Sequence, residues 1–163
     1  MEGNWFKVQL SVVFLVIAVM MVFSSLNMPS QPNNMEMKHS CACALNCMDG
    51  RVQDVVRDGT KKECAAGVVD VITQAGMVKV LADNKDNVLI ENIKCELLIS
   101  VKKHGTKNVS IAAHEDCAGN PVSKEGQIKH LKQAKKTIES FGLGVKIILF
   151  WVGPPFKKAE LVE

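Results

Sequence analysis

Two short segments of the sequence carry residue types that bind a catalytic metal ion. The first is Cys47-Met-Asp49-Gly-Arg51, and the second is His114-Glu-Asp-Cys117. Two cysteine thiolates and one imidazole are good Zn²⁺ ligands, and three protein ligands leave a fourth position open, as in catalytic zinc sites. Zinc-bound water has a pKa near ~7, so hydroxide is available at neutral pH. Cys47, His114 and Cys117 are therefore predicted to bind zinc.

The acid and the base that follow Cys47 make this prediction more specific. A His-x-x-Cys spacing alone carries little information, whereas its combination with Cys-x-Asp-x-Arg is more selective. An arginine side chain can hold a carboxylate through two parallel hydrogen bonds. Asp49 and Arg51 are therefore candidate catalytic residues. The alternative interpretation is an acid that the dipole of a following helix stabilises, beside a surface base.

Four apolar or β-branched runs alternate with segments of helical periodicity. The predicted strands cover residues 41–47, 68–73, 108–113 and 145–152. Three helices are predicted. A short one follows Gly50, a second runs from Asp86 or Asn87 to Gly105, and a third runs from Ile128 to Gly142. This alternation is typical of an α/β fold with a parallel sheet. Ligands bind beyond the carboxyl ends of such strands, where both candidate motifs begin.

The two motifs together resemble the signature of the β-class carbonic anhydrases. The stretch from His104 to Gly119 also resembles the third-strand region of that family. The resemblance covers about residues 41–152 and is closest to a compact group that lacks the longer helical extensions. It implies a compact parallel sheet of strand order 2-1-3-4 with flanking helices.

The resemblance also implies a mechanism. Zinc is expected on Cys47, His114 and Cys117, and Asp49 either ligates zinc in a closed state or pairs with Arg51. When paired, the carboxylate accepts a hydrogen bond from zinc-bound hydroxide and orients it. The hydroxide attacks CO₂ and gives bicarbonate, so these are the expected small-molecule partners. The expected assembly is a homodimer or a subunit of a membrane complex.

The sequence departs from the family pattern at several points. Gly50 stands where the family usually has serine, and Gln74-Ala75-Gly76 follows the second strand in place of an asparagine-rich loop. The chain contains no tyrosine for the pocket. His104 or His130 is a candidate proton relay, although either is compatible with an ordinary surface histidine.

The amino-terminal end is strongly apolar. Residues 12–23 form an unbroken apolar run, and about 19 uncharged residues come close to the ~30 Å thickness of a bilayer core. We expect a membrane anchor or signal segment at residues 1–27, a linker at residues 28–39 and the zinc domain at residues 40–163. Lys7 before the run weakly favours an extracytoplasmic domain, periplasmic or lumenal, which is secreted if the segment is cleaved.

Other functions remain open at this stage. The same zinc chemistry would serve a COS or CS₂ hydrolase, and a non-catalytic zinc-binding subunit of a membrane complex is a further alternative. A thiol redox protein would use Cys41 and Cys43, and up to two disulfides can form among Cys41, Cys43, Cys64 and Cys95. A net charge of +3 and 5% aromatic residues argue against a nucleic-acid partner.

Overall fold

A computed structural model describes residues 40–163 of the chain. The predicted anchor and linker lie outside the described residues, so they stay predictions. Within residues 40–163, no helix combines the length and the apolar character needed to cross a membrane. The nine elements are β1 (Cys41–Asn46), α2 (Gln53–Cys64), β2 (Val68–Thr73), α3 (Met77–Asp83), α4 (Asn87–Lys103), β3 (Asn108–His114), α5 (Lys124–Ser140), β4 (Lys146–Val152) and β5 (Glu160–Leu161).

The strands form one mixed sheet of order β2-β1-β3-β4-β5. The first four strands are parallel, in the predicted order 2-1-3-4, but β5 pairs antiparallel with β4. The prediction of an all-parallel sheet is therefore wrong at this edge. The chain turns back after Gly153-Pro154-Pro155, and β5 has only two residues, both exposed. Such a short, solvent-facing strand leaves no periodicity to recognise.

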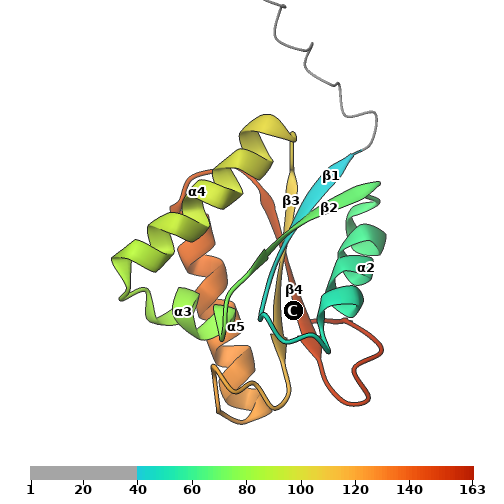
Figure 1. Cartoon of the computed structure of the whole chain (residues 1–163), viewed down its shortest axis with the longest axis vertical. Helices are drawn as coiled ribbons and strands as arrows, with labels where there is room; N and C mark the ends of the chain where they lie inside the picture. The colour runs from blue at the N-terminus through green and yellow to red at the C-terminus, as the bar shows by residue number, and fades with distance from the viewer. Residues whose placement is uncertain (1–39) are drawn as a thin grey trace, which may run out of the picture. The chain divides into compact units, whose positions relative to one another are not determined.

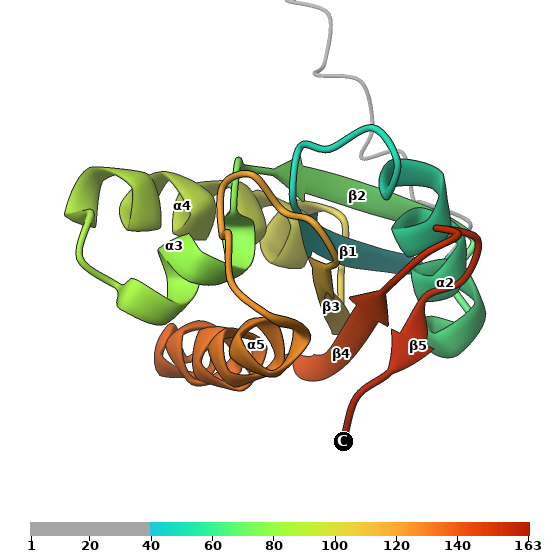
Figure 2. The ribbon, with the colours of Figure 1, turned by 90° about the horizontal axis from the view of Figure 1, so that it is seen from below.

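Helices cover both faces of the sheet (Figures 1 and 2): α3, α4 and α5 lie on one face, and α2 lies on the other. Two buried apolar clusters match these two faces, with Leu45 and Ile111 in the larger cluster and Ala44 and Ala112 in the smaller. Adjacent residues of β1 and β3 therefore point to opposite layers. All six residues of β1 are buried, which explains why the sequence of this strand is almost entirely apolar.

Two helices begin at a side chain that accepts a hydrogen bond from a backbone N–H of the first turn. The Asp86 carboxylate accepts a hydrogen bond from the Leu89 backbone N–H at 3.1 Å, which confirms the predicted start of α4. Ser123 accepts one from the Gly126 N–H in the same way at the start of α5. Helix α3 is not among the predicted elements. It starts after Gly76, which has a left-handed backbone conformation. With only seven residues it is too short to show a clear helical periodicity of apolar residues.

Candidate metal centre and its carboxylate–arginine pair

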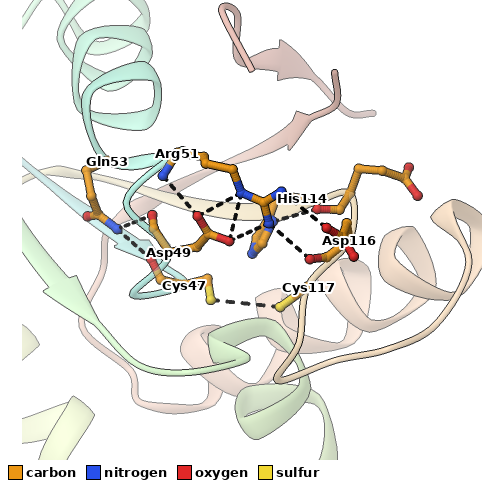
Figure 3. A network of polar contacts seen from close by, with 8 residues as sticks. Cys47, Asp49, Arg51, Gln53, His114, Asp116 and Cys117 are labelled. Carbon is orange, nitrogen blue, oxygen red and sulfur yellow. Dashed lines mark hydrogen bonds and ion pairs between the residues drawn. The ribbon is translucent and has the colours of Figure 1, made fainter. Parts of the chain in front are cut away.

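Three predicted ligands meet at the carboxyl edge of the sheet. Cys47 directly follows β1, His114 ends β3, and Cys117 lies in the turn after β3. The two sulfur atoms are 3.8 Å apart, and the ligand atoms of all three residues lie within 4.8 Å of one another. All three side chains are buried (Figure 3). We call these residues the carboxyl-edge cluster.

The donor atoms of the carboxyl-edge cluster fit a zinc ion. His114 Nδ1 lies 2.8 Å from the Glu115 carbonyl oxygen, so Nδ1 carries the proton and donates it there. His114 Nε2 is then left with a free lone pair, and it is buried without a hydrogen-bond partner. Two sulfurs bound at ~2.3 Å to one tetrahedral zinc lie about 3.8 Å apart, as Cys47 and Cys117 do. Three such ligands leave one coordination position open.

The thiol of Cys117 is costly to ionise without a cation. Burial raises its pKa, and the neighbouring Cys47 raises it further. The backbone amides of Gly119 and Asn120 face the sulfur and partly offset this effect. A divalent cation favours the thiolate outright, because coordination displaces the proton. The electrostatics of the cluster therefore favour binding of a cation between the two sulfurs.

The predicted acid and base form an ion pair beside the cluster. Arg51 Nη2 donates to Asp49 Oδ2 at 2.6 Å, Nε lies 3.0 and 3.1 Å from the two carboxylate oxygens, and the Arg51 backbone N–H donates to Oδ1 at 2.9 Å. These hydrogen bonds lower the pKa of Asp49 to about 2. The Asp49 carboxylate therefore stays ionised throughout the physiological pH range.

Arg51 is itself held by parts of the chain that are distant in sequence. It donates to the Asp116 side chain and to the Asp116 carbonyl oxygen, both at 3.2 Å. Its guanidinium carbon also lies 4.6 Å from the centre of the Phe156 ring, within range of a cation–π interaction. Phe156 and Asp116 were not among the predicted site residues. Nothing local in their sequence signals these contacts, because two separate loops bring them to Arg51.

Two amide side chains fix the turn between Cys47 and Asp49. Gln53, the first residue of α2, donates to the carbonyl oxygens of both residues at 2.8 Å. Asn46 donates to the Cys47 carbonyl oxygen at 2.8 Å and to the Gln53 side chain at 3.0 Å. Sequence reasoning missed both amides, although their positions directly beside the motif offered a signal. They orient the backbone that presents the thiol and the carboxylate.

The loop after β2 packs directly on the loop that carries Cys117. A Cβ atom on Gly119 would lie 2.4 Å from the Gly76 nitrogen, and one on Gly76 would lie 2.3 Å from the Gly119 carbonyl oxygen. Only glycine allows this backbone contact. The segment Gln74-Ala75-Gly76 therefore packs closely, from the side of β2, against the turn that carries Cys117.

The two candidate proton relays have different positions. His104 caps α4 and lies 2.7 Å from Asp70, near the amino ends of β1 and β2. It is far from the carboxyl-edge cluster, because β1 spans six residues at ~3.3 Å each. Of the two interpretations given for His104, this position favours an ordinary, partly exposed histidine over a proton relay at the site. His130 lies 3.1 Å from Asn120, just after Cys117, and its role stays a prediction.

The fold and the ligand set place this chain in a known class. A family model described as "Putative carbonic anhydrase" matches residues 37–162. The chain belongs to this carbonic anhydrase-like family. The sequence has no match among curated proteins.

Solved carbonic anhydrases, two of them described as β-carbonic anhydrases, are similar in structure. Isoform I from Trichomonas vaginalis has a TM-score of 0.53 at 17% identity, with 99% of this chain and 97% of that chain covered. The Aspergillus fumigatus enzyme CafA has a TM-score of 0.46 at 12% identity, covering 95% and 91%. The carbonic anhydrase from Streptococcus mutans has 0.41 at 15%, covering 74% and 81%. The first of these likenesses supports the shared fold.

Proposed function

We propose that this chain is a membrane-anchored, zinc-dependent carbonic anhydrase that converts CO₂ and water into bicarbonate and a proton. The observation that supports this most is the buried, unpartnered Nε2 of His114 beside two sulfur atoms 3.8 Å apart. An ionised carboxylate, Asp49, lies next to this donor set and is held by Arg51. Membership of the carbonic anhydrase-like family supports the proposed activity.

Each residue has a defined task in this proposal. Zinc on Cys47, His114 and Cys117 would lower the pKa of a coordinated water toward ~7 and so supply a nucleophile at neutral pH. Asp49 stays ionised and accepts a hydrogen bond from the O–H of the nucleophile, which orients a lone pair toward the carbon of CO₂. Arg51 keeps both carboxylate oxygens of Asp49 in place. This lowers the entropic cost of orienting the nucleophile toward CO₂.

The central test measures zinc and activity on one sample of the full-length chain in detergent. Wild type is expected to contain zinc and to hydrate CO₂ in a stopped-flow assay. Asp49→Asn removes the acceptor charge and is expected to reduce the rate by about 10²-fold or more, within the range of a lost acid–base or orienting group. Asp54→Asn, an exposed acid on α2, is the matched control and should retain the wild-type rate.

Other results would point to the alternatives. Zinc without any hydration activity between pH 7 and 8.5 would contradict catalysis and support a non-catalytic subunit. An unchanged rate in Asp49→Asn would contradict the role of this carboxylate. Competition between CO₂ and COS in the same assay separates the hydratase from a COS hydrolase, because the preferred substrate suppresses turnover of the other.

The membrane anchor is a separate part of the proposal, which the apolar run at residues 12–23 supports. The expected location of the zinc domain is extracytoplasmic. An uncleaved anchor predicts that the intact chain stays with membranes through an alkaline carbonate wash, and that protease added outside intact cells or vesicles digests the domain. Release of a shortened chain lacking about the first 27 residues would instead show a cleaved signal.

A further inference from the structure

A second group of metal-binding side chains lies near the opposite edge of the sheet. Cys41 begins β1, Asp70 lies in β2, and His104 caps α4, and their ligand atoms lie within 4.8 Å of one another. The Cys41 sulfur is 3.6 Å from Asp70 Oδ2, which in turn is 2.7 Å from His104 Nδ1. We call these residues the amino-edge cluster. The proposed hydratase mechanism uses none of them.

Thiolate, imidazole and carboxylate are all zinc ligands, and three different elements supply them. A sulfur at ~2.3 Å and an oxygen at ~2.0 Å from one tetrahedral zinc lie about 3.5 Å apart, close to the separation of Cys41 and Asp70. The nitrogen and oxygen of His104 and Asp70 would need to separate to about 3.3 Å. The side chains of His104 and Asp70 can move apart by this small distance because both are partly exposed. Cys41, in contrast, is only 6% exposed.

The surroundings leave access for a metal ion. A surface groove of about 350 Å³ is lined by Asp70 and His104 together with Glu96 of α4. Water from the groove can complete the coordination. Burial raises the pKa of Cys41, and the Asp70 carboxylate raises it too, so the thiol is protonated at neutral pH without a metal. A bound cation would compensate both the buried sulfur and the carboxylate beside it.

Catalysis through a thiol fits this geometry less well. A cysteine nucleophile needs a base within hydrogen-bond distance, with a third group to orient that base. Here the carboxylate lies between the sulfur and the imidazole, so the base position is taken by a group that raises the pKa of Cys41. The arrangement is that of three ligands around one position.

We propose that Cys41, Asp70 and His104 form a second zinc site, which fastens the start of β1 to β2 and to the end of α4. The site takes no part in the proposed hydration of CO₂, and it is independent of whether the carboxyl-edge cluster is catalytic. With both clusters loaded, the chain holds two zinc ions.

The experiment counts zinc in the full-length chain in detergent, after loading with zinc and removal of loosely bound metal. Wild type is expected to hold two zinc ions per chain, and His104→Ala, a change at a partly exposed side chain, to hold one. Loss of a ligand should weaken zinc at this site by at least about 100-fold in competition with a chelator, since outer-shell changes alone cost 10–100-fold. Cys41→Ala should also hold one zinc, and Cys95→Ser, which alters an exposed thiol of α4, should keep two.

The remaining zinc in His104→Ala should disappear when Cys47→Ser is added, which separates the two sites. Cobalt substitution gives an independent readout, because loss of one thiolate ligand in Cys41→Ala should weaken the sulfur-to-cobalt charge-transfer absorption. A zinc content that neither variant at the amino edge lowers, whether wild type holds one zinc ion or two, would overturn the proposal. CO₂ hydration by His104→Ala should stay within about twofold of wild type.

Discussion

The two edges of the sheet each gather cysteine and histidine, but they differ in how far the protein already satisfies these side chains. At the carboxyl edge, His114 points a free nitrogen at two buried sulfurs, and its other nitrogen is bound to a carbonyl oxygen. At the amino edge, His104 already forms a hydrogen bond with Asp70 and is partly exposed. Buried ligand atoms without hydrogen-bond partners can bind a metal ion directly. Ligand atoms that already share a hydrogen bond must first give up that bond.

The largest expected contrast comes from the same substitution at both edges. His114→Ala removes the nitrogen ligand of the carboxyl-edge cluster, so CO₂ hydration should fall to the uncatalysed background. His104→Ala should keep its hydration rate, as stated above. Stopped-flow hydration of the two variants at equal protein concentration measures the contrast. Equal activity of the two variants would remove the functional distinction between the edges.

The carboxyl edge also depends on the close backbone contact between Gly76 and Gly119. In Gly119→Ala, the new Cβ would overlap the Gly76 backbone, so the two loops must separate. We expect a loss of about 1–3 kcal/mol in the free energy of unfolding and weaker zinc binding. Gly50→Ala meets no atom within 4 Å and should change the free energy of unfolding by less than ~0.5 kcal/mol. Chemical denaturation of both variants checks this, and equal stabilities would argue against the contact.

Thiol labelling can sharpen the comparison without mutation. Cys95 is exposed and should react first. Removal of zinc by a chelator should expose Cys47 and Cys117 at the carboxyl edge, and also Cys41 if the amino edge holds zinc. Burial raises the pKa of Cys43 to about 12, so this thiol should stay unreactive in the folded protein. Mass spectrometry of labelled peptides shows which cysteines react at once, which react only after zinc removal and which do not react. Labelling of Cys47 at equal rates with and without chelator would contradict zinc binding by this residue.

The smallest expected effect is the pH dependence of the Asp49–Arg51 pair. Hydrogen bonds from Arg51 lower the pKa of Asp49 to about 2 in the folded protein, against ~3.9 for a free side chain. The stabilisation is therefore fully present above about pH 4 and is lost as the pH falls through 2. Both side chains contact solvent, so we expect less than about 1 kcal/mol. Denaturant melts of wild type and Asp49→Asn between pH 2 and 5 should converge at the acid end, and parallel curves would contradict this.

The candidate site could be predicted from sequence where its residues stand in short motifs at strand ends. Cys47 and His114 follow apolar runs, so the parallel topology alone brings them to one edge. Phe156 and Gln53 escaped prediction because their contacts depend on how loops and a helix fold over the motif. The position of His104 could not be predicted, since the helical period of α4 predicts where the helix ends but not which edge of the sheet that end reaches.

The sequence by itself determined the zinc-type donor set, the acid–base pair and the four strands of the parallel sheet, whereas their order 2-1-3-4 was implied by the family resemblance. Local patterns carry this information, because strand periodicity and motif spacing involve neighbouring residues. The tertiary structure alone decided that His114 keeps a free Nε2, that Gly76 meets Gly119, and that Cys41, Asp70 and His104 come together. These three features depend on how segments distant in sequence pack against one another. Burial and backbone contacts determine that packing, and the local periodicity of the sequence does not reveal it.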